Sequence, residues 1–399
     1  MNAHHFNQRR LAHRAAIIIG IVLLLGGCLA DAGSGASSLN QGFPRQLHIP
    51  GFDSEGIFDP SMIKDPNSSA LWMSYTHVQH VPVNGTTVRL LHIRLATSED
   101  NGATWTDAGV QISESDVSPN QPQEFRGLTA AWKQEVSRLM FDPGAPVEKR
   151  WKLAWHRYLW VNDPASSEKR KAQYGWIALK EASSPLALAQ APEQKLFVGK
   201  AYDLITDQAF TRSVLGEPLI RLWQTHPELD ECVAFTEPGL LAKADALYMS
   251  LICLTGFDGK VILVKLNHSN EAWSYVTTVM TASDAQLIDS SYINFSASEM
   301  FSVGDTDYLM VSPNALPNRL YNGCLIFRFE DFASGQLTDE DNDQLPDVVQ
   351  RLQSHQGGIN KGACAYAESS TNSGIIIGEI FPVGLPFARL YMTGVNLFD

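Results

Sequence analysis

FDPSMIKDPNSSALWMSYTHV (residues 58–78) carries a pattern that returns three more times along the chain. A carboxylate precedes an apolar, strand-like run, an acidic or Gly-containing turn follows, and a second run is rich in aromatic residues. The other copies are MFDPGAPVEKRWKLAWHRY (140–158), FTEPGLLAKADALYMSLICL (235–254) and SASEMFSVGDTDYLMVSP (296–313). Repeated strand–turn–strand units on this scale are typical of the blades of a β-propeller.

A weaker fifth copy, GACAYAESSTNSGIIIGEIF, occupies residues 362–381. Runs rich in Val, Ile, Tyr, Phe and Trp, punctuated by Gly, Asp, Asn and Pro, indicate strands. We therefore predict an all-β fold, a five-bladed β-propeller of four-stranded antiparallel blades over residues 46–399. Residues 184–230 predict a large insertion, and helix patterns are confined to residues 202–210 and 348–353. The alternative, a pair of β-sandwiches, gives no reason for an acid at the head of each unit.

The first 27 residues are predicted to be a lipoprotein signal peptide. A segment containing three Arg residues precedes the apolar run 15–25, which is too short to span a bilayer. The sequence Leu-Gly-Gly-Cys ending at Cys28 resembles the lipobox of bacterial lipoproteins, in which the Cys is lipidated. Residues 28–45 are predicted to be a flexible tether. We expect an outer-membrane lipoprotein of the bacterial envelope, periplasmic or surface-facing; the alternative is an ordinary signal peptide or anchor with a chance Cys.

The composition argues against nucleic-acid binding. The chain has 43 acidic and 30 basic residues and a formal net charge of −13. It has no basic stripe of the kind found in nucleic-acid-binding proteins. It also lacks a Gly-x-Ser-x-Gly elbow, a phosphate loop and a Rossmann fingerprint, so no motif of these three classes indicates its function.

Four cysteines lie beyond Cys28, at Cys232, Cys253, Cys324 and Cys364. An oxidising compartment permits disulfides, and four cysteines allow three pairings. Cys232 and Cys253 flank an apparent hairpin, which favours that pair. Buried free thiols are the alternative, and no spacing resembles a zinc site.

Carboxylates stand at the head of the first four units, at Asp59, Asp142, Glu237 and Glu299. The first strand of each propeller blade lines the central channel, so residues in the same phase converge at one mouth. Carboxylates gathered there repel one another and lose solvent, which raises at least one pKa. Glycoside hydrolysis needs this division between a protonated acid and an ionised base or nucleophile. The alternative for each carboxylate is a structural role as an acceptor of backbone N–H groups.

The openings of the first three units resemble those of known enzymes. FDPS (58–61), FDP (141–143) and EPGLLAKADALYMSL (237–251) resemble the blade openings of five-bladed glycoside hydrolases of family 43 and its relatives in families 32 and 68. The resemblance covers residues 52–398 as a pattern, without one strong motif.

This resemblance implies a role for each acid. Asp59 would be the base that activates water, Glu237 the general acid, and Asp142 the residue that orients the sugar and raises the pKa of Glu237. Family 43 enzymes invert, which suits carboxyls about 6.5–9.5 Å apart. The chain departs from the family in that Pro238 follows Glu237 directly, whereas a small residue usually separates the two.

Further side chains are candidates for sugar binding. Arg126 and His156 can hydrogen-bond a sugar, and Trp132 can stack on its C–H face. Glu299 is a reserve candidate for the same role. The alternative is that the aromatic residues pack the blades and that His156 is a structural histidine within a strand.

TDEDNDQLPD (338–347) resembles the first part of an oxygen-rich calcium loop. The ligands would come from Asp339, Asp341, Asp343, Leu345 and Asp347. Gln344 replaces the usual turn glycine, and Gln350 stands where an EF-hand would have its bidentate Glu. The sequence predicts a structural calcium ion here, with a solvated acidic loop as the alternative.

The spacing of Ser98, Asp100, Gly102, Thr104 and Trp105 resembles the Asp box of sialidases. It predicts a hairpin turn in which Ser and Thr bond the backbone and Trp105 packs beneath. Because that turn would join the outer strands of the first blade, Asp100 is not expected to be catalytic.

Two functions follow from the sequence. The first is a lipoprotein glycoside hydrolase that acts on a glycan and requires no cofactor for its chemistry. The alternative is a non-catalytic propeller of the same ancestry that binds carbohydrate or a protein partner. A sialidase ranks third, because no Arg triad and no second Asp box is visible.

Overall fold

The computed structural model describes residues 42–394 with short gaps. The gaps are residues 84, 118–120, 166–168, 211–215, 217–218, 257, 354–355, 368–373 and 382–385. The described residues all lie in one compact unit, residues 38–399. The predicted signal peptide, Cys28 and most of the predicted tether lie outside them.

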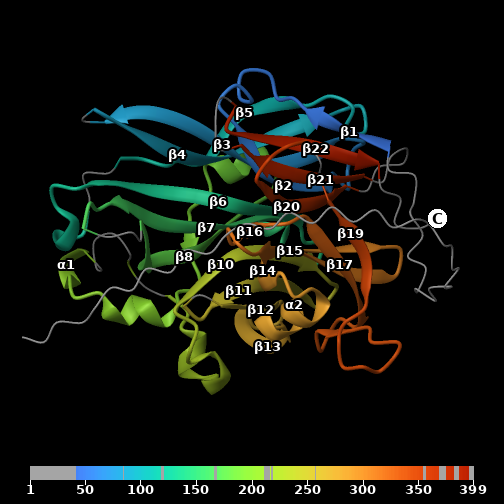
Figure 1. The fold of residues 1–399 in the computed structure, drawn as a ribbon. Helices are drawn as coiled ribbons and strands as arrows, with labels where there is room; N and C mark the ends of the chain where they lie inside the picture. The colour runs from blue at the N-terminus through green and yellow to red at the C-terminus, as the bar shows by residue number, and fades with distance from the viewer. Residues whose placement is uncertain are drawn as a thin grey trace, which may run out of the picture. The chain divides into compact units, whose positions relative to one another are not determined.

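The described strands form five antiparallel sheets, and each sheet is one blade (Figure 1). Blade 1 is β2 (Ile57–Lys64), β3 (Leu71–Val83), β4 (Thr86–Ser98) and β5 (Thr106–Ser113). Blade 2 is β6 (Thr129–Phe141), β7 (Trp151–Asn162), β8 (Arg170–Ala182) and β9 (Gln194–Lys195). Blade 3 is β10 (Ala234–Ala242), β11 (Ala246–Leu254), β12 (Gly259–Asn267) and β13 (Ala272–Met280).

Blades 4 and 5 depart from the simple order. Blade 4 is β14 (Tyr292–Val303), β15 (Thr306–Ala315), β17 (Cys324–Asp331) and β18 (Gln336–Leu337), with β16 (Leu320–Tyr321) on β15 and β19 (Val348–Leu352) on β17. Blade 5 is β20 (Asn360–Ala367), β21 (Gly374–Ile380), β22 (Ala388–Gly394) and, at its edge, β1 (Gly42–Leu47). One blade thus combines strands from both ends of the described chain, and β1 begins four residues before the predicted start of the propeller.

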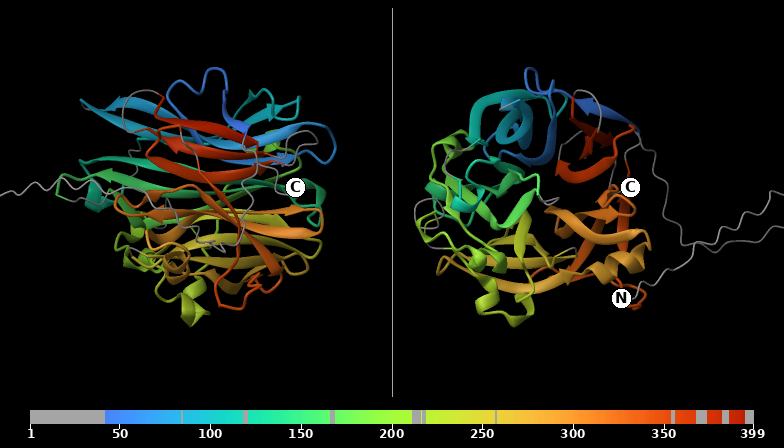
Figure 2. Two further views of the ribbon diagram at one scale, coloured as in Figure 1. Left: turned by 45° about the vertical axis from the view of Figure 1, so that its right-hand side comes forward. Right: turned by 60° about the vertical axis from the view of Figure 1, so that its left-hand side comes forward.

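The first strands β2, β6, β10, β14 and β20 contact one another in succession, and β20 contacts β2. The blades therefore follow one another around a centre (Figure 2). The predicted all-β, five-bladed propeller is confirmed. Its largest hydrophobic cluster joins blades 1, 2 and 3 and includes Phe197 and Leu229 of the insertion.

Helices are few and short, as predicted, but one predicted helix is wrong. Residues 348–352 form β19, because they pair with β17 and alternate between exposed and more buried positions. The longest helix is α2 (Ala282–Ile288), which begins after a capping box at Thr281. Within the part of the chain that is described, no helix is long and apolar enough to cross a membrane.

Each first strand carries a β-bulge at the same place. The pairing with the second strand shifts there in all five blades. One residue in each shift has a positive φ: Asp59 (49°), Val136 (53°), Glu237 (55°), Ala297 (47°) and Ala363 (50°). Positive φ is unfavourable for residues with a Cβ, so tertiary contacts must stabilise this conformation at each of the five bulges.

The bulges align the blades differently from the sequence repeat. β6 ends at Phe141, so Asp142 lies in the turn beyond the strand and not at its head. Glu299 lies two residues after the bulge residue of β14, Ala297. Asp59 and Glu237 share the bulge position, whereas Asp142 and Glu299 are out of phase with them. The apolar residues before Asp142 form the end of β6, which is longer than the sequence repeat predicts. Asp-Pro is common in the turns that follow strands.

Two disulfides are present, Cys232–Cys253 and Cys324–Cys364. The first is the favoured pair and joins the chain just before β10 to β11. The second links β17 of blade 4 to β20 of blade 5, a contact between blades that sequence spacing does not predict.

In the turn between β4 and β5, Ser98 bonds the backbone as predicted, whereas the Thr104 hydroxyl donates to the Asp100 carboxylate (2.6 Å) and not to the backbone. Asp100 accepts from the Ser98 hydroxyl (2.8 Å) and from the N–H of Thr104 (2.7 Å), and the Gly102 N–H donates to Ser98 (2.8 Å). Trp105 is buried beneath them. Bonds from Thr104 and Ser98 lower the pKa of Asp100 to about 2, so this carboxylate holds a turn together.

Candidate active site in the central channel

Asp59 stands at the bulge of β2 and is 3% exposed. Its Oδ2 accepts hydrogen bonds from the Val136 N–H of blade 2 (3.1 Å) and from the Thr76 hydroxyl (3.3 Å). Burial raises the pKa of Asp59 well above its usual range, and the charges of Glu135 and Glu237 raise it further. This carboxyl therefore retains a proton more readily than an ordinary aspartate.

Glu237 occupies the matching bulge of β10 and is also buried. Its Oε2 accepts from the Ala297 N–H of blade 4 (2.7 Å), and its Oε1 accepts from the Tyr321 hydroxyl (2.9 Å). The bulge depends on Gly239, where an added Cβ would lie 2.3 Å from the Ser250 hydroxyl. Both carboxylates thus bind the bulge N–H of the next blade, which fixes their positions.

Glu135 is the third carboxylate of the site, and the sequence reading missed it. It precedes the bulge residue Val136 in β6 and bonds Arg170 (2.9 Å). Burial raises its pKa, with Glu237 adding to the rise and Arg170 opposing it. No local pattern distinguishes Glu135, because Lys133, Gln134 and Arg138 stand close to it in the same strand. We call Asp59, Glu135 and Glu237 the carboxyl cluster.

Aromatic and basic side chains surround the carboxyl cluster. Arg170 lies over the ring of Tyr158, with its guanidinium carbon 4.5 Å from the ring centre. Burial and the charges of the three carboxylates raise the pKa of Tyr321 well above its usual range. His156 stacks on Tyr158 (4.9 Å) and is fully buried, and burial lowers its pKa well below the usual value. His156 is therefore a neutral residue behind the site.

Asp142 is not part of the carboxyl cluster. Its carboxylate is fully buried and contacts His268 of blade 3 (3.0 Å) and Lys152 (3.7 Å), while Gly144 donates to it from the turn (3.1 Å). It lies six residues beyond Val136, roughly 20 Å along an extended strand. The predicted convergence of Asp142 with Asp59 and Glu237 is corrected accordingly: Glu135 supplies the carboxylate of blade 2.

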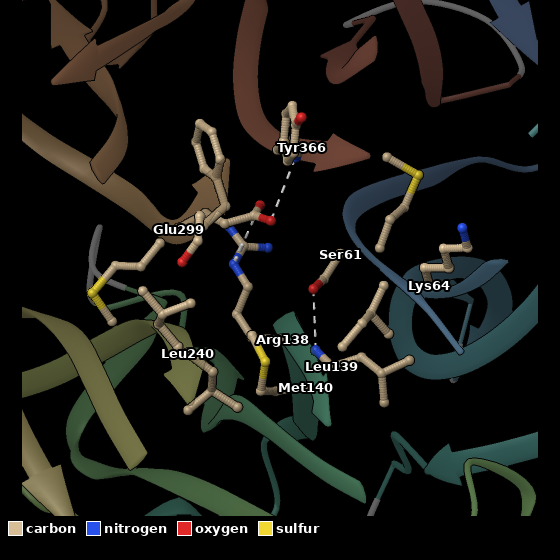
Figure 3. Close-up of a pocket in the computed structure, with 14 residues that line it drawn as sticks. Ser61, Lys64, Arg138, Leu139, Met140, Leu240, Glu299 and Tyr366 are labelled. Atoms are coloured by element: carbon tan, nitrogen blue, oxygen red, sulfur yellow. Dashed lines mark hydrogen bonds and ion pairs between the residues drawn. The ribbon is translucent and has the colours of Figure 1, made fainter. Parts of the chain in front are cut away.

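Arg138 and Glu299 lie next to each other in the lining of a pocket (Figure 3). The Arg138 guanidinium donates to the carbonyl of Pro60 in blade 1 (3.0 Å) and to that of Ser298 in blade 4 (3.2 Å). Its Nε lies 3.9 Å from Glu299, which accepts from the Tyr366 N–H (3.4 Å). The pair borders a cavity of about 200 Å³. Since Pro60 and Ser298 each follow a bulge residue, the hydrogen bonds of Arg138 connect the bulges of blades 1 and 4.

The other predicted sugar-binding residues lie elsewhere. Trp132 is 2% exposed and packs between Trp176 and Phe210, so it belongs to the core. Arg126 is exposed and follows the short 3₁₀ helix η1 (Gln123–Phe125). Neither contacts the carboxyl cluster among the described interactions.

The acidic loop between β18 and β19 brings three predicted ligands together. One carboxylate oxygen each from Asp339, Asp341 and Asp343 lies within 4.8 Å of the others. Gln344 has a φ of 70°, the conformation for which glycine is usual at this loop position. Three alternating carboxylates fit an ion that prefers oxygen ligands. Leu345 and Asp347 are not in this group: the Leu345 N–H bonds Asp343, and Asp347 accepts from Glu340.

Comparison with protein-family models gives no match, and neither does comparison with curated proteins. Solved structures are similar. An exo-β-1,3-galactanase from Clostridium thermocellum has a TM-score of 0.51 and 10% identity, over 89% of this chain and 62% of that one. An exo-1,5-α-L-arabinanase from a bovine ruminal metagenomic library has a TM-score of 0.48 and 13% identity, over 89% and 96%. A thermostable family-43 glycoside hydrolase has a TM-score of 0.48 and 12% identity, over 87% and 91%.

The chain is a five-bladed β-propeller with structural neighbours among glycoside hydrolases of families 43 and 32. Identities of 10–13% carry the fold alone. The chemistry must therefore be argued from the carboxyl cluster. The buried carboxyls of Asp59 and Glu135 have raised pKa values and stand with Glu237 beside a basic and a phenolic group, and these groups can exchange protons with a substrate and with water.

Proposed function

We propose that the chain is a glycoside hydrolase that cleaves a glycosidic bond at the carboxyl cluster. The observation that carries the proposal is the meeting of Asp59, Glu135 and Glu237. They come from three consecutive blades, they are buried, and their charges act on one another. Buried groups with perturbed pKa in a channel are typical of acid–base chemistry.

In the proposed reaction, Asp59 is the general base and Glu237 the general acid. Asp59 takes a proton from water, whose oxygen forms a bond to the anomeric carbon. The bond from that carbon to the leaving oxygen breaks, and this oxygen takes a proton from Glu237. The configuration at the anomeric carbon inverts. A raised pKa suits Asp59 as a base, because proton transfer is most effective when the pKa lies near the working pH.

Glu135 and Arg170 take the supporting role that the family resemblance implied for Asp142. The negative charge of Glu135 lies close enough to Glu237 for each to act on the other. The charge of Glu237 raises the pKa of Glu135. The Arg170 guanidinium, bonded to Glu135, is placed to donate to a sugar hydroxyl.

The substrate is proposed to be a glycan. Neighbouring structures are described as an arabinanase and a galactanase, so arabinose- and galactose-containing polymers are the first to test. The proposed location is the bacterial outer membrane, with a lipid on Cys28 as the anchor. The support for that location is the Leu-Gly-Gly-Cys sequence that ends at Cys28.

The alternative function is a non-catalytic propeller that binds carbohydrate or a protein partner. One observation favours it: both carboxylate oxygens of Glu237 already have hydrogen-bond donors within the protein. A structural carboxylate has the same environment.

The test compares wild type, Asp59→Asn and Glu237→Gln on aryl arabinofuranosides, galactosides and xylosides. Each variant should lose about 10²–10⁴-fold in kcat, the usual contribution of a general acid or base. Glu237→Gln should lose far less on a dinitrophenyl leaving group, which departs without a proton, whereas Asp59→Asn should lose equally on all. Wild-type kcat/KM should rise with pH as Asp59 ionises, because the carboxylate is the active base.

Asp65→Asn is the matched control, because Asp65 also precedes a proline but caps a turn through the Asn67 N–H (2.9 Å). It should keep wild-type rates. Equal rates for wild type, Asp59→Asn and Glu237→Gln would refute the assignment. Glycan binding by a wild-type protein that hydrolyses no glycoside would favour the non-catalytic alternative.

A further inference from the structure

A second pocket lies between blades 2 and 3, apart from the carboxyl cluster. It is lined by the turn that follows β6, by β8 and β9, and by the β12–β13 hairpin. Its volume of about 310 Å³ is at the lower end of the range for small-molecule sites, about 300–1,000 Å³. We call it the interblade pocket and define it by Lys149, Glu181, Gln194, Asn267 and Trp273. It shares no lining residue with the carboxyl cluster.

The apolar lining of the interblade pocket includes Trp273 of β13. This side chain is half-buried and meets Phe197 edge-on, with ring centres 5.3 Å apart. Leu196 and Ile220 of the insertion continue the apolar lining. An accessible indole held by a core aromatic is a surface on which the C–H face of a sugar ring can pack.

The polar side of the interblade pocket is held in place by a buried network. Lys152 is 2% exposed and bonds both Asp142 and Glu181. Glu181 in turn accepts from the Gln194 amide (2.7 Å), and Asp142 contacts His268 (3.0 Å). A charge this deeply buried must stay paired, so these contacts fix the side chains that reach the pocket.

The charged side chains that line the interblade pocket are paired with one another. Lys149 pairs with Glu271 across the pocket (3.3 Å), and Lys152 pairs with two carboxylates, so each cation has a partner. By contrast, the Gln194 carbonyl and the Asn267 amide nitrogen have no hydrogen-bond partner among the described residues. An acceptor and a donor that are both uncharged suit hydroxyl groups, which donate and accept.

We propose that the interblade pocket binds one neutral sugar residue of a glycan chain, packed against Trp273 and bonded by Gln194 and Asn267. This inference rests on the proposed function only for the expectation that the ligand is a glycan; it requires no catalysis. A second sugar site on the same rigid molecule raises the local concentration of polymer at the propeller. It also gives Asp142 a role, since its buried network organises the pocket.

Binding is measured in the Glu237→Gln background, so that the probe is not degraded. The probes are soluble arabinan, β-1,3-galactan and arabinoxylan in affinity gel electrophoresis, followed by calorimetry with the polymer that binds. Adding Trp273→Ala should weaken binding about tenfold, because it removes the aromatic surface. Gln194→Ala should weaken it about three- to tenfold through the lost hydrogen bond. Trp273→Phe, which keeps an aromatic ring, should stay within about threefold of the Glu237→Gln background.

Thermal unfolding of each variant shows whether the fold is kept. A folded Trp273→Ala variant that binds as tightly as its background would overturn the inference, and so would failure of all three polymers to bind. An aryl glycoside, which is too small to bridge the two sites, separates this inference from the proposed function. Trp273→Ala alone should cleave it at the wild-type rate while losing activity on polymer. Polymer binding through Trp273 by a protein without hydrolytic activity would refute the proposed function and leave the inference standing.

Discussion

Glu299 illustrates how burial alone changes a residue. It is 5% exposed beside Arg138, and burial raises its pKa to about 7 although the arginine opposes the rise. The folded protein therefore binds this proton more tightly than the unfolded chain does. The stability that Glu299 contributes is complete below its ordinary pKa, near 4.5, and is lost as the pH rises toward 7.

Glu299→Gln should remove this part of the pH dependence. We expect the variant to exceed wild type by about 2–3 kcal/mol in unfolding free energy at pH 8, and to differ little at pH 4.5. Urea unfolding at the two pH values measures the difference. Asp59 also has a raised pKa and is unchanged in the variant. The unfolding free energy of the variant should therefore still fall in part as the pH rises.

Glu148→Gln is the control for Glu299→Gln, because Glu148 is exposed in a short 3₁₀ helix. It should follow wild type at both pH values. A Glu299→Gln variant with the full wild-type pH dependence would show that burial of Glu299 does not shift its pKa in the folded protein.

At the scale of elements, the β-bulge is the device that builds the site. Three of the five bulges donate a backbone N–H to the preceding blade: Val136 to Asp59, Ala297 to Glu237, and Ala363 to the Ser312 hydroxyl (2.9 Å). The same local geometry therefore positions two acids of the carboxyl cluster and one serine. The blades differ in the side chain that accepts this hydrogen bond.

The loop between β18 and β19 carries the calcium prediction, which remains to be tested. Calcium that binds only the folded protein stabilises it in proportion to RT ln(1 + [Ca²⁺]/Kd), about 2.7 kcal/mol at a hundredfold excess over Kd. We expect millimolar calcium to raise the Tm of the wild type, magnesium to do so much less, and Asp341→Asn to lose the response.

Asp331→Asn is the control, because Asp331 caps a neighbouring turn through the Ala333 N–H (3.0 Å) and lies outside the group of three. It should respond to calcium as wild type does. A wild-type Tm that is unchanged by calcium would favour the solvated acidic loop.

At the scale of the whole molecule, β1 joins the two ends of the described chain within blade 5. It pairs with β22 and so joins the beginning of the described chain to the end. Leu47 and the following Ile49 are buried against residues of blades 1 and 5. Without β1, the edge of β22 would be unpaired, and an unpaired edge strand promotes association between molecules.

A chain that begins at residue 50 should therefore be less stable than one that begins at residue 41. Loss of Leu47 and Ile49 alone removes about 3–6 kcal/mol of apolar burial, which corresponds to a Tm about 4–8 °C lower for a domain of this size. Calorimetry measures the Tm, and light scattering should detect association of the shorter chain. Equal Tm values would mean that the propeller closes without β1.

Much of this architecture could be read from the chain. Five strand–turn–strand copies predict five blades, the hairpin flanked by Cys232 and Cys253 predicts a disulfide, and the spacing around Asp100 predicts a turn. These features depend on contacts between residues near in sequence, so local patterns carry them. Asp59 and Glu237 were found for the same reason, because each begins its copy of the pattern.

Tertiary structure determined which residue of β6 occupies the bulge of blade 2. Its positive-φ bulge at Val136 is unfavourable locally and persists because the Val136 N–H binds Asp59, 77 residues away. No local pattern records such a bond, so the Asp-Pro after the strand appeared to mark the head of the blade. Packing between blades placed Glu135 in the channel and Asp142 between blades 2 and 3. The repeat was therefore encoded in the sequence, whereas the third carboxylate of the site was selected by hydrogen bonds that form only when the blades assemble.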